Sequence, residues 1–285
     1  MRILVTGGGS GIGKALVEQL CKYNCQIIIV GRRIDLLKSV ASICPEKIFF
    51  IQADIGNEID RLKIVDEIKK GPHLTHVVHN AAVVEPVSLI NEINLEQYRN
   101  QQAINIEGPL FLTKGLLEYS SLECRFLFIS SEAADNPWEG ISSYCISKAA
   151  LEMVCKSYKT EFTDKGKGFY FTNLRPGGVK TPMSEKLSKT STSFFPSADI
   201  VLERISKGNI FQPEFCAKFI EWVLIKTSNE LYQKWWDIDN EEDKNLWVGF
   251  ENKNLEHIVG NLPFFLDEEN SLSPSEITNL YVCKL

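Results

Sequence analysis

The segment Thr6-Gly7-Gly8-Gly9-Ser10-Gly11-Ile12-Gly13 decides the fold class of this chain. It follows the apolar run Ile3–Val5 and leads directly into the helical pattern Ile12–Cys21. Glycines between a strand and a helix let the backbone turn tightly and let a pyrophosphate approach the N–H groups at the helix start. The spacing is T-G-x-x-x-G-x-G, not the common G-x-G-x-x-G. A merely flexible turn is the alternative, but the position after the first strand favours a nucleotide site.

Short apolar runs alternate with helix-length patterns up to about residue 240. This alternation predicts a doubly wound α/β (Rossmann) domain over residues 1–240, a parallel sheet with helices on both faces. The expected strands are Ile3–Val5, Ile27–Val30, Ile48–Ile51, His76–His79, Arg125–Ile129, Phe169–Leu174 and Lys234–Asn240. The expected helices are Ile12–Cys21, Ile34–Ser42, Ile59–Lys69, Leu95–Tyr119, Ile141–Thr163 and Pro213–Thr227. Residues 181–212 are too long and apolar for an ordinary loop and are expected to form a lid or two short helices.

Composition limits the possible functions. The chain has 285 residues, 44% of them apolar and 24% charged, which is ordinary for a globular protein. No apolar run approaches the roughly 20 residues that span a bilayer, and the N-terminus lacks a secretory signal, so we expect no membrane contact and a cytoplasmic location. The net charge of −6 argues against nucleic acid. The eight cysteines are scattered without a C-x-x-C pair, so neither a disulfide framework nor a metal site is expected.

The negative charge is concentrated at the C-terminus. Residues 241–285 carry nine acidic side chains against three lysines, so the whole net charge of −6 lies in this segment. The preceding 240 residues are electrically balanced. Such a shift in composition predicts an acidic C-terminal extension, residues 241–285, attached to a complete domain.

The end of the second expected strand points to the identity of the cofactor. Sites that select NAD place Asp or Glu there to bind the ribose 2′-OH. This strand ends instead in Val30-Gly31-Arg32-Arg33. Guanidinium groups suit a 2′-phosphate by charge and by bidentate geometry. The sequence therefore favours NADP(H), although a solvated basic turn is the simpler alternative.

The chain resembles the short-chain dehydrogenase/reductase family over about residues 1–240. The resemblance rests on motifs in the family's order: the glycine loop, Ala53-Asp54-Ile55, Asn80-Ala81-Ala82, Asn105, Ser131, Tyr144-Cys145-Ile146-Ser147-Lys148 and Pro176-Gly177-Gly178-Val179-Lys180-Thr181. It implies a cofactor site formed by Thr6, Gly7, Ser10, Gly11, Ile12, Gly13, Arg32, Arg33, Asp54, Ile55, Asn80, Ala81, Tyr144, Lys148, Pro176, Gly177, Val179 and Thr181. It also implies a homodimer or homotetramer. The residues His79-Asn80-Ala81-Ala82 depart from the family's N-N-A-G, which makes this loop bulkier.

The catalytic residues implied by the resemblance are Asn105, Ser131, Tyr144 and Lys148. Tyr144 and Lys148 are four residues apart on a helix and share a face, where an ammonium should lower the pKa of a phenol. Tyr144 would then donate a proton to a substrate carbonyl, while Ser131 hydrogen-bonds the same oxygen. The resemblance implies that Lys148 also holds the nicotinamide ribose and that Asn105 holds a water linked to Lys148. Taken singly, a Tyr–Lys pair is common on exposed helices, and a serine after a strand is usually a turn residue.

Apolar side chains near the expected catalytic residues indicate the substrate class. Trp138, Met183, Phe194 and Phe195 are the candidates for binding a small-molecule carbonyl substrate, an apolar or aromatic ketone, aldehyde or diketone. The segments Arg175-Pro176-Gly177 and Trp236-Asp237-Ile238 resemble the benzil-reductase and sepiapterin-reductase group. Two alternatives remain open. The chain could be a cofactor-binding regulatory protein without turnover, or a scaffold whose acidic tail contacts a partner.

Overall fold

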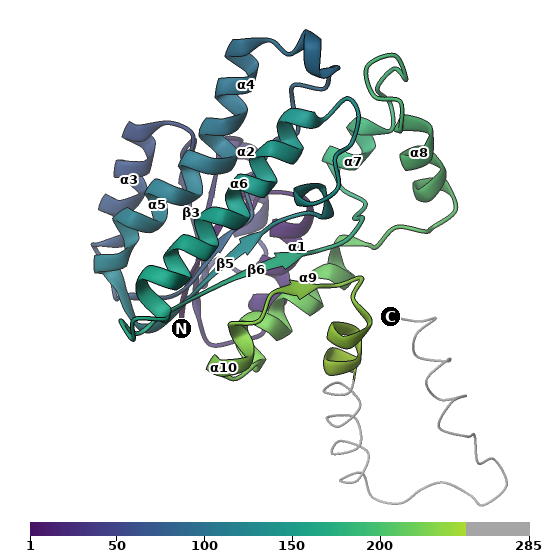
Figure 1. The fold of residues 1–285 in the computed structure, drawn as a ribbon. Helices are drawn as coiled ribbons and strands as arrows, with labels where there is room; N and C mark the ends of the chain where they lie inside the picture. The colour runs from purple at the N-terminus through teal and green to yellow at the C-terminus, as the bar shows by residue number, and fades with distance from the viewer. Residues whose placement is uncertain (249–285) are drawn as a thin grey trace, which may run out of the picture. The chain divides into compact units, whose positions relative to one another are not determined.

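The computed structural model describes residues 1–248, and within them a seven-stranded parallel sheet forms the centre (Figure 1). Its order is β3-β2-β1-β4-β5-β6-β7. The strands are β1 (Arg2–Thr6), β2 (Gln26–Gly31), β3 (Ile48–Gln52), β4 (Leu74–His79), β5 (Ser120–Ile129), β6 (Phe169–Arg175) and β7 (Trp236–Asp237). The order reverses between β1 and β4, so a crevice is expected beyond the carboxyl ends of these two strands. The predicted doubly wound α/β fold is confirmed.

Helices cover both faces of the sheet. They are α1 (Gly11–Leu20), α2 (Ile34–Ala41), α3 (Glu58–Ile68), α4 (Leu95–Gln102), α5 (Gly108–Leu116), α6 (Ser142–Tyr158), α7 (Pro182–Leu187), α8 (Ala198–Ser206), α9 (Pro213–Glu221) and α10 (Asn229–Tyr232). The helices α3, α5 and α6 pack on one face through Ile64, Leu112 and Leu151, and α1 packs with α9 on the other (Figure 1). Residues 181–212 contain the two short helices α7 and α8.

The long helix expected over Leu95–Tyr119 is interrupted. The segment divides into α4, a π-helical turn over Ala103–Glu107, α5 and a final 3-10 turn. Pro109 explains the interruption, because it has no N–H to donate to the carbonyl four residues earlier, which belongs to Asn105. The helices expected over Ile141–Thr163 and Pro213–Thr227 likewise end in π-helical turns.

The last strand is shorter than the expected Lys234–Asn240. Only Trp236 and Asp237 pair with β6. The chain then turns, because the Asp237 carboxylate accepts the N–H of Asp239 at 2.9 Å and the Asp237 carbonyl accepts the N–H of Asn240 at 3.0 Å. These contacts favour a turn over a longer strand.

The chain divides into two compact units, Met1–Lys244 and Asn245–Leu285. The first unit extends four residues beyond the expected boundary at residue 240. Most of the expected acidic extension, residues 249–285, lies outside the described residues. Within residues 1–248, no helix is long and apolar enough to cross a membrane.

Candidate active site

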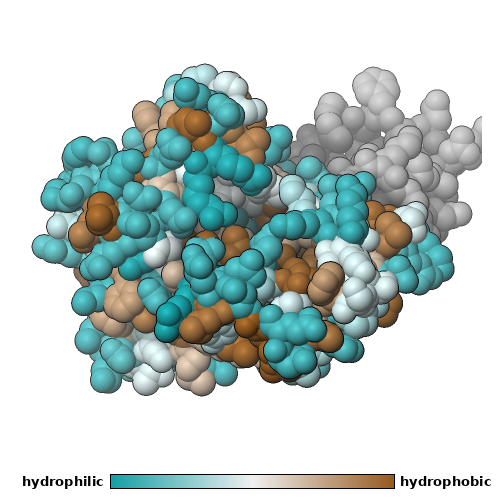
Figure 2. Space-filling view, turned by 90° about the horizontal axis from the view of Figure 1, so that it is seen from above, coloured by the Kyte–Doolittle hydropathy of each residue, from teal (hydrophilic) through white to brown (hydrophobic). Residues whose placement is uncertain are grey.

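A cavity of about 430 Å³ lies beyond the carboxyl ends of the central strands, between the glycine loop and the segment of α7 and α8. Figure 2 shows apolar residues gathered around a hollow in a largely polar face of the molecule. Most of the residues expected from the sequence line this cavity. They are Gly7, Ser10, Gly11, Ile12, Arg32, Arg33, Asp54, Ile55, Asn80, Ala81, Ser131, Trp138, Tyr144, Lys148, Pro176, Gly177, Val179, Thr181, Met183 and Phe195.

The glycine loop supplies the polar floor of the cavity. Gly7 and Gly11 adopt left-handed conformations, with φ of 70° and 53°, that other residues rarely take. Ser10 is the N-cap of α1, yet its side chain does not cap the helix. The first N–H groups of α1 therefore keep free hydrogen-bonding capacity at the cavity, which is the arrangement that binds phosphate at helix starts.

Thr6 and Gly13 support the loop and do not line the cavity, contrary to the expectation that they bind the cofactor. Thr6 is fully buried, and its hydroxyl accepts the N–H groups of Asn80 and Ala81, both at 3.1 Å. At Gly13, a Cβ atom would lie 2.3 Å from the carbonyl oxygen of Gly7. Both residues hold the loop from beneath because the close approach of β1, α1 and the segment after β4 leaves no space between them.

The two arginines after β2 have different partners. Arg33 donates to the Ser10 hydroxyl at 2.9 Å, which holds its guanidinium beside the glycine loop. Arg32 forms an ion pair with Asp54 at 3.5 Å. The charge of Arg32 is therefore partly offset, whereas within the described residues Arg33 forms no ion pair. Arg33 is the better placed of the two for a phosphate ligand.

Three of the four catalytic residues expected from the sequence come together at the other end of the cavity: Ser131, Tyr144 and Lys148. The Tyr144 phenol and the Ser131 hydroxyl both line the cavity and lie close enough to interact. The Lys148 ammonium lies 5.5 Å from the centroid of the Tyr144 ring and donates to the carbonyl of Ile129 at 2.8 Å. A hydroxyl pair beside an ammonium can place a proton and a hydrogen bond on one carbonyl oxygen.

Burial dominates the protonation of this pair. It raises the pKa of Tyr144 above its ordinary value, against the opposing effect of the hydrogen bond to Ser131. It also lowers the pKa of Lys148 to about 8, although the nearby Glu152 carboxylate favours the charged form. Burial therefore outweighs the lowering of the Tyr144 pKa that was expected from Lys148. At neutral pH Tyr144 carries its proton, as a proton donor must.

Comparison with known proteins gives the family. The model of the family described as short chain dehydrogenase matches residues 1–192. The chain belongs to this family. A benzil reductase ((S)-benzoin forming) from Bacillus cereus is 27% identical over 231 residues, which cover 78% of this chain and 93% of the relative. This short-chain dehydrogenase is thus an oxidoreductase by family.

Solved structures of similar fold carry either nicotinamide cofactor. A short-chain dehydrogenase from Burkholderia cenocepacia in complex with NADP has a TM-score of 0.72 at 20% identity, covering 84% of this chain and 96% of its own. A 3-ketoacyl-(acyl-carrier-protein) reductase from Brucella melitensis complexed with NADH also has a TM-score of 0.72 at 20% identity, covering 85% and 98%. The similarity in fold therefore does not choose between the two forms of the cofactor.

In this short-chain dehydrogenase the side chain of Asn105 contacts the segment after β4. Its amide donates to the Val83 carbonyl at 2.8 Å and to the Ser147 hydroxyl at 2.9 Å, and its oxygen accepts the Val83 N–H at 2.9 Å. Asn105 is 1% exposed and does not line the cavity. These hydrogen bonds use the side chain of Asn105 fully. Its backbone carbonyl lacks the usual helical donor, because Pro109 has no N–H, and this carbonyl could hold a water.

The substrate end of the cavity is apolar. Trp138, Met183 and Phe195 lie there as expected, and Phe195 is 1% exposed. Phe194, in contrast, does not line the cavity and is 48% exposed. Both phenylalanines donate their N–H to the Ser191 carbonyl, and in this tight turn only Phe195 faces the core. Sequence reasoning missed further lining residues, whose types carry no motif: Val84, Ile141, Leu187, Val201 and Arg204.

One ion pair joins the segment over the cavity to the body of the domain. The ammonium of Lys186, on α7, contacts the carboxylate of Glu85, in the segment after β4. Both side chains are well exposed, at 61% and 45%. The contact joins two segments that both contribute residues to the cavity, through Val84 and Met183.

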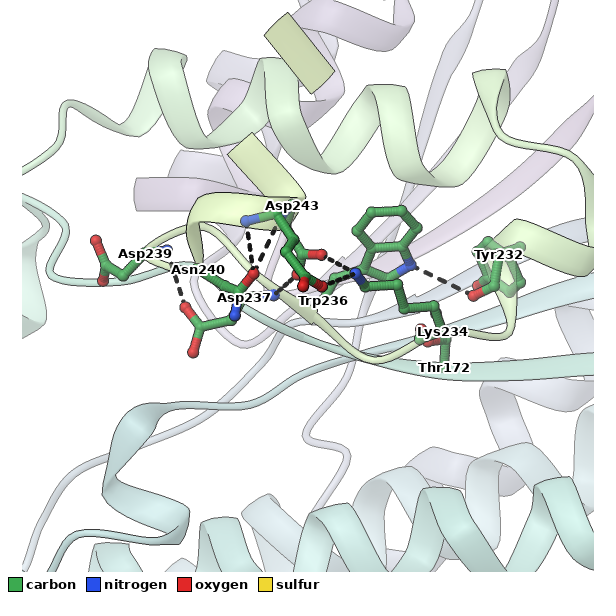
Figure 3. A network of polar contacts seen from close by, with 9 residues as sticks. Thr172, Tyr232, Lys234, Trp236, Asp237, Asp239, Asn240 and Asp243 are labelled. Carbon is green, nitrogen blue, oxygen red and sulfur yellow. Dashed lines mark hydrogen bonds and ion pairs between the residues drawn. The ribbon is translucent and has the colours of Figure 1, made fainter. Parts of the chain in front are cut away.

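A polar network behind the cavity, also missed from the sequence, fixes the edge strand β7 (Figure 3). The carboxylate of Asp243, 2% exposed, forms an ion pair with Lys234 and accepts the N–H of Asp237 at 2.8 Å. A Cβ atom at Gly177 would lie 2.7 Å from a carboxylate oxygen of Asp239. The residues around β7 therefore pack directly against the turn that lines the cofactor end of the cavity.

Proposed function

We propose that this chain is an NADPH-dependent carbonyl reductase in which Tyr144 is the proton donor. The observation that carries the proposal is the placement of the Tyr144 and Ser131 hydroxyls beside Lys148, on the same cavity as the glycine loop and Arg33. One end of the cavity suits an anionic dinucleotide, and the other end suits an apolar carbonyl compound.

The residues present fit NADP(H). The uncapped start of α1 suits the pyrophosphate, and Arg33, held by Ser10, suits the 2′-phosphate with Arg32 beside it. Asp54 and Ile55 would border the adenine, and Lys148 would hold the nicotinamide ribose. When bound, the cofactor supplies the hydride.

The protein's own residues supply the proton and the electrostatic stabilisation. Tyr144 would transfer its phenolic proton to the substrate oxygen, and Ser131 would donate a hydrogen bond to the same oxygen as charge develops there. The Lys148 ammonium would stabilise the resulting phenolate. Since Lys148 is charged below about pH 8 and loses its charge above it, the reduction rate should fall on the alkaline side of about pH 8. The backbone carbonyl of Asn105 is the group that could hold a water linked to Lys148.

The substrate proposed is a ketone, aldehyde or diketone with an apolar or aromatic body. Trp138, Met183 and Phe195 support this class because they surround the catalytic end of the cavity with apolar surface. The similarity to a benzil reductase supports an aromatic diketone in particular.

We also propose that the protein is cytoplasmic and forms a homodimer or homotetramer. All seven cysteines of the described residues are free thiols, which suits a reducing compartment. Exposed apolar side chains on α4, α5 and α6 support association: Leu95, Phe111, Ile146 and Met153.

The test is an NADPH-oxidation assay with benzil and a panel of small ketones and aldehydes, on wild type and on Tyr144→Phe. Removing one hydroxyl should lower kcat by about a hundredfold or more and leave the Kd for NADPH nearly unchanged. Tyr98→Phe, on α4, is the matched control. Near-normal kcat in Tyr144→Phe would refute the assignment. NADPH binding without oxidation by any carbonyl compound would favour the regulatory alternative.

A further inference from the structure

Helix α6 presents three polar side chains at four-residue spacing, on one face, to the end of strand β5. Their partners are three successive residues, Ile129–Ser131. The pairs are Tyr144 with the Ser131 hydroxyl, Lys148 with the Ile129 carbonyl at 2.8 Å, and Glu152 with the Ser130 hydroxyl at 2.8 Å. Two of these three side chains belong to the proposed reaction, and the third, Glu152, has no role in it so far.

Glu152 also ties this face to strand β6. It is 5% exposed, and its two oxygens accept Nε and Nη2 of Arg175 at 2.9 and 3.0 Å. Arg175 forms a second ion pair, with Asp135, at 2.6 Å. A buried carboxylate with this many donors is held in one orientation. Because Arg175 directly precedes Pro176, Glu152 links three of the segments that build the site.

We propose that Glu152 is a positioning residue of the reaction: it fixes the end of β5 through Ser130 and supplies the negative charge that faces the Lys148 ammonium. The proposal rests on the proposed function, in which Ser131 and Lys148 act on the reacting groups. It also gives the two neighbouring serines different roles: Ser130 donates to Glu152, and Ser131 remains available to Tyr144.

Charged and titratable groups from every neighbouring element surround this carboxylate. Arg175 comes from β6, Asp135 from the turn after β5 and Asp237 from β7, while Lys148, Cys155 and Lys156 belong to α6 itself. Burial lowers the pKa of Lys148, and Glu152 is the charged group that opposes this effect. Arg175 and Asp135 are paired with each other, so their charges largely cancel at Lys148.

The first experiment removes the charge and keeps the shape. Glu152→Gln retains a carbonyl oxygen for Ser130 and Arg175 but loses the anion. The titration of Lys148 is followed by NMR of protein labelled with [ε-13C]lysine, its signal assigned with Lys148→Arg. We expect the pKa of Lys148 to fall by about one unit, because an opposite charge has been removed. In the pH profile of kcat/KM, the apparent pKa of the alkaline limb should fall by the same amount. Glu161→Gln, an exposed glutamate on the continuation of α6, is the matched control.

The second experiment removes the hydrogen bond from Ser130 to Glu152 and keeps the charge of the Glu152 carboxylate. Ser130→Ala should lower kcat by about tenfold, the effect of about 1.4 kcal/mol on orienting Ser131, and leave the Lys148 titration unchanged. This variant removes one oxygen atom, so it also serves if Glu152→Gln does not fold. A merely structural role for Glu152 would lower stability without moving the titration of Lys148.

These experiments distinguish an error in the role of Glu152 from an error in the proposed reductase activity. An unchanged Lys148 titration in Glu152→Gln, or unchanged kcat in Ser130→Ala with an active wild type, overturns the role of Glu152 and leaves the proposed reductase intact. A wild-type protein that reduces no carbonyl compound overturns the reductase, whereas the NMR titration still decides whether Glu152 acts on Lys148.

Discussion

The two ends of the cavity are built in different ways. The cofactor end is made of backbone and buried hydrogen bonds, with Thr6 and Asn80 locking a loop in which Gly13 has no space for a side chain. The substrate end is made of apolar side chains, many of them on the short helices α7 and α8 and the turn between them. Backbone sites demand particular residues at particular spacings, whereas an apolar wall accepts many residues of similar size. The difference explains why the cofactor class is readable from motifs and the substrate is not.

The largest expected effect comes from the packing of the substrate end. Phe195→Ala should reduce the free energy of unfolding by about 3–5 kcal/mol, the usual cost of removing a buried phenyl ring, and raise the KM for substrate. Phe194→Ala, the adjacent exposed residue, should change stability by less than about 0.5 kcal/mol. Urea denaturation of the two variants makes the measurement. Equal effects would show that the turn between α7 and α8 is not packed as described.

A second pair of variants tests the packing of the backbone at the cofactor end. Gly13→Ala should weaken NADPH binding by about tenfold to a hundredfold, since overpacking beneath the loop costs about 1–3 kcal/mol. Gly178→Ala makes the same change where the nearest contact of the new Cβ would be an ordinary 3.7 Å. Its Kd for NADPH should stay within about twofold of wild type, well inside one 1.4 kcal/mol step. Fluorescence titration with NADPH compares the two, and a tolerated Gly13→Ala would contradict the backbone account of this site.

The sequence predicted the parts of the site that depend on local spacing. The glycine loop lies within one strand-turn-helix unit, and Tyr144 and Lys148 share one helix face, so their geometry follows from the chain nearby. It could not give the direction of a side chain that tertiary contacts decide. Asn105 turns to Val83, and Phe194 turns to solvent. The contact between Asp243 and Lys234 joins segments that no spacing rule connects.

The third prediction separates the two arginines at the cofactor end. Wild type should bind NADPH at least about tenfold more tightly than NADH, the effect of one charge-assisted contact. Arg33→Ala should remove most of this preference, because Arg33 lies beside the glycine loop on Ser10. Arg32→Ala should remove less, since Arg32 is already paired with Asp54. Equal Kd values for NADPH and NADH in wild type would refute the assignment of the cofactor.

The smallest effect is expected from removing the C-terminal segment after Lys244. A chain of residues 1–244 keeps Asp243 and its contacts, so its Kd for NADPH should stay within about twofold of wild type. A cut after Asn240 removes Asp243 and should lower the melting temperature further than the cut after Lys244. A change in substrate KM alone, in the 1–244 chain, would show that the acidic extension acts on the substrate end. A 1–244 chain that does not fold would refute the extension as a separate part.

The ion pair between Lys186 and Glu85 makes the contact between α7 and the segment after β4 dependent on ionic strength. Both groups are exposed, so added salt screens their attraction, with a Debye length of about 8 Å under physiological conditions. The contact between α7 and the segment after β4 therefore loosens as salt rises, while the buried hydrogen bonds of Thr6 do not. If opening of this side limits product release, turnover will increase with moderate salt until weaker phosphate binding at Arg33 outweighs the gain.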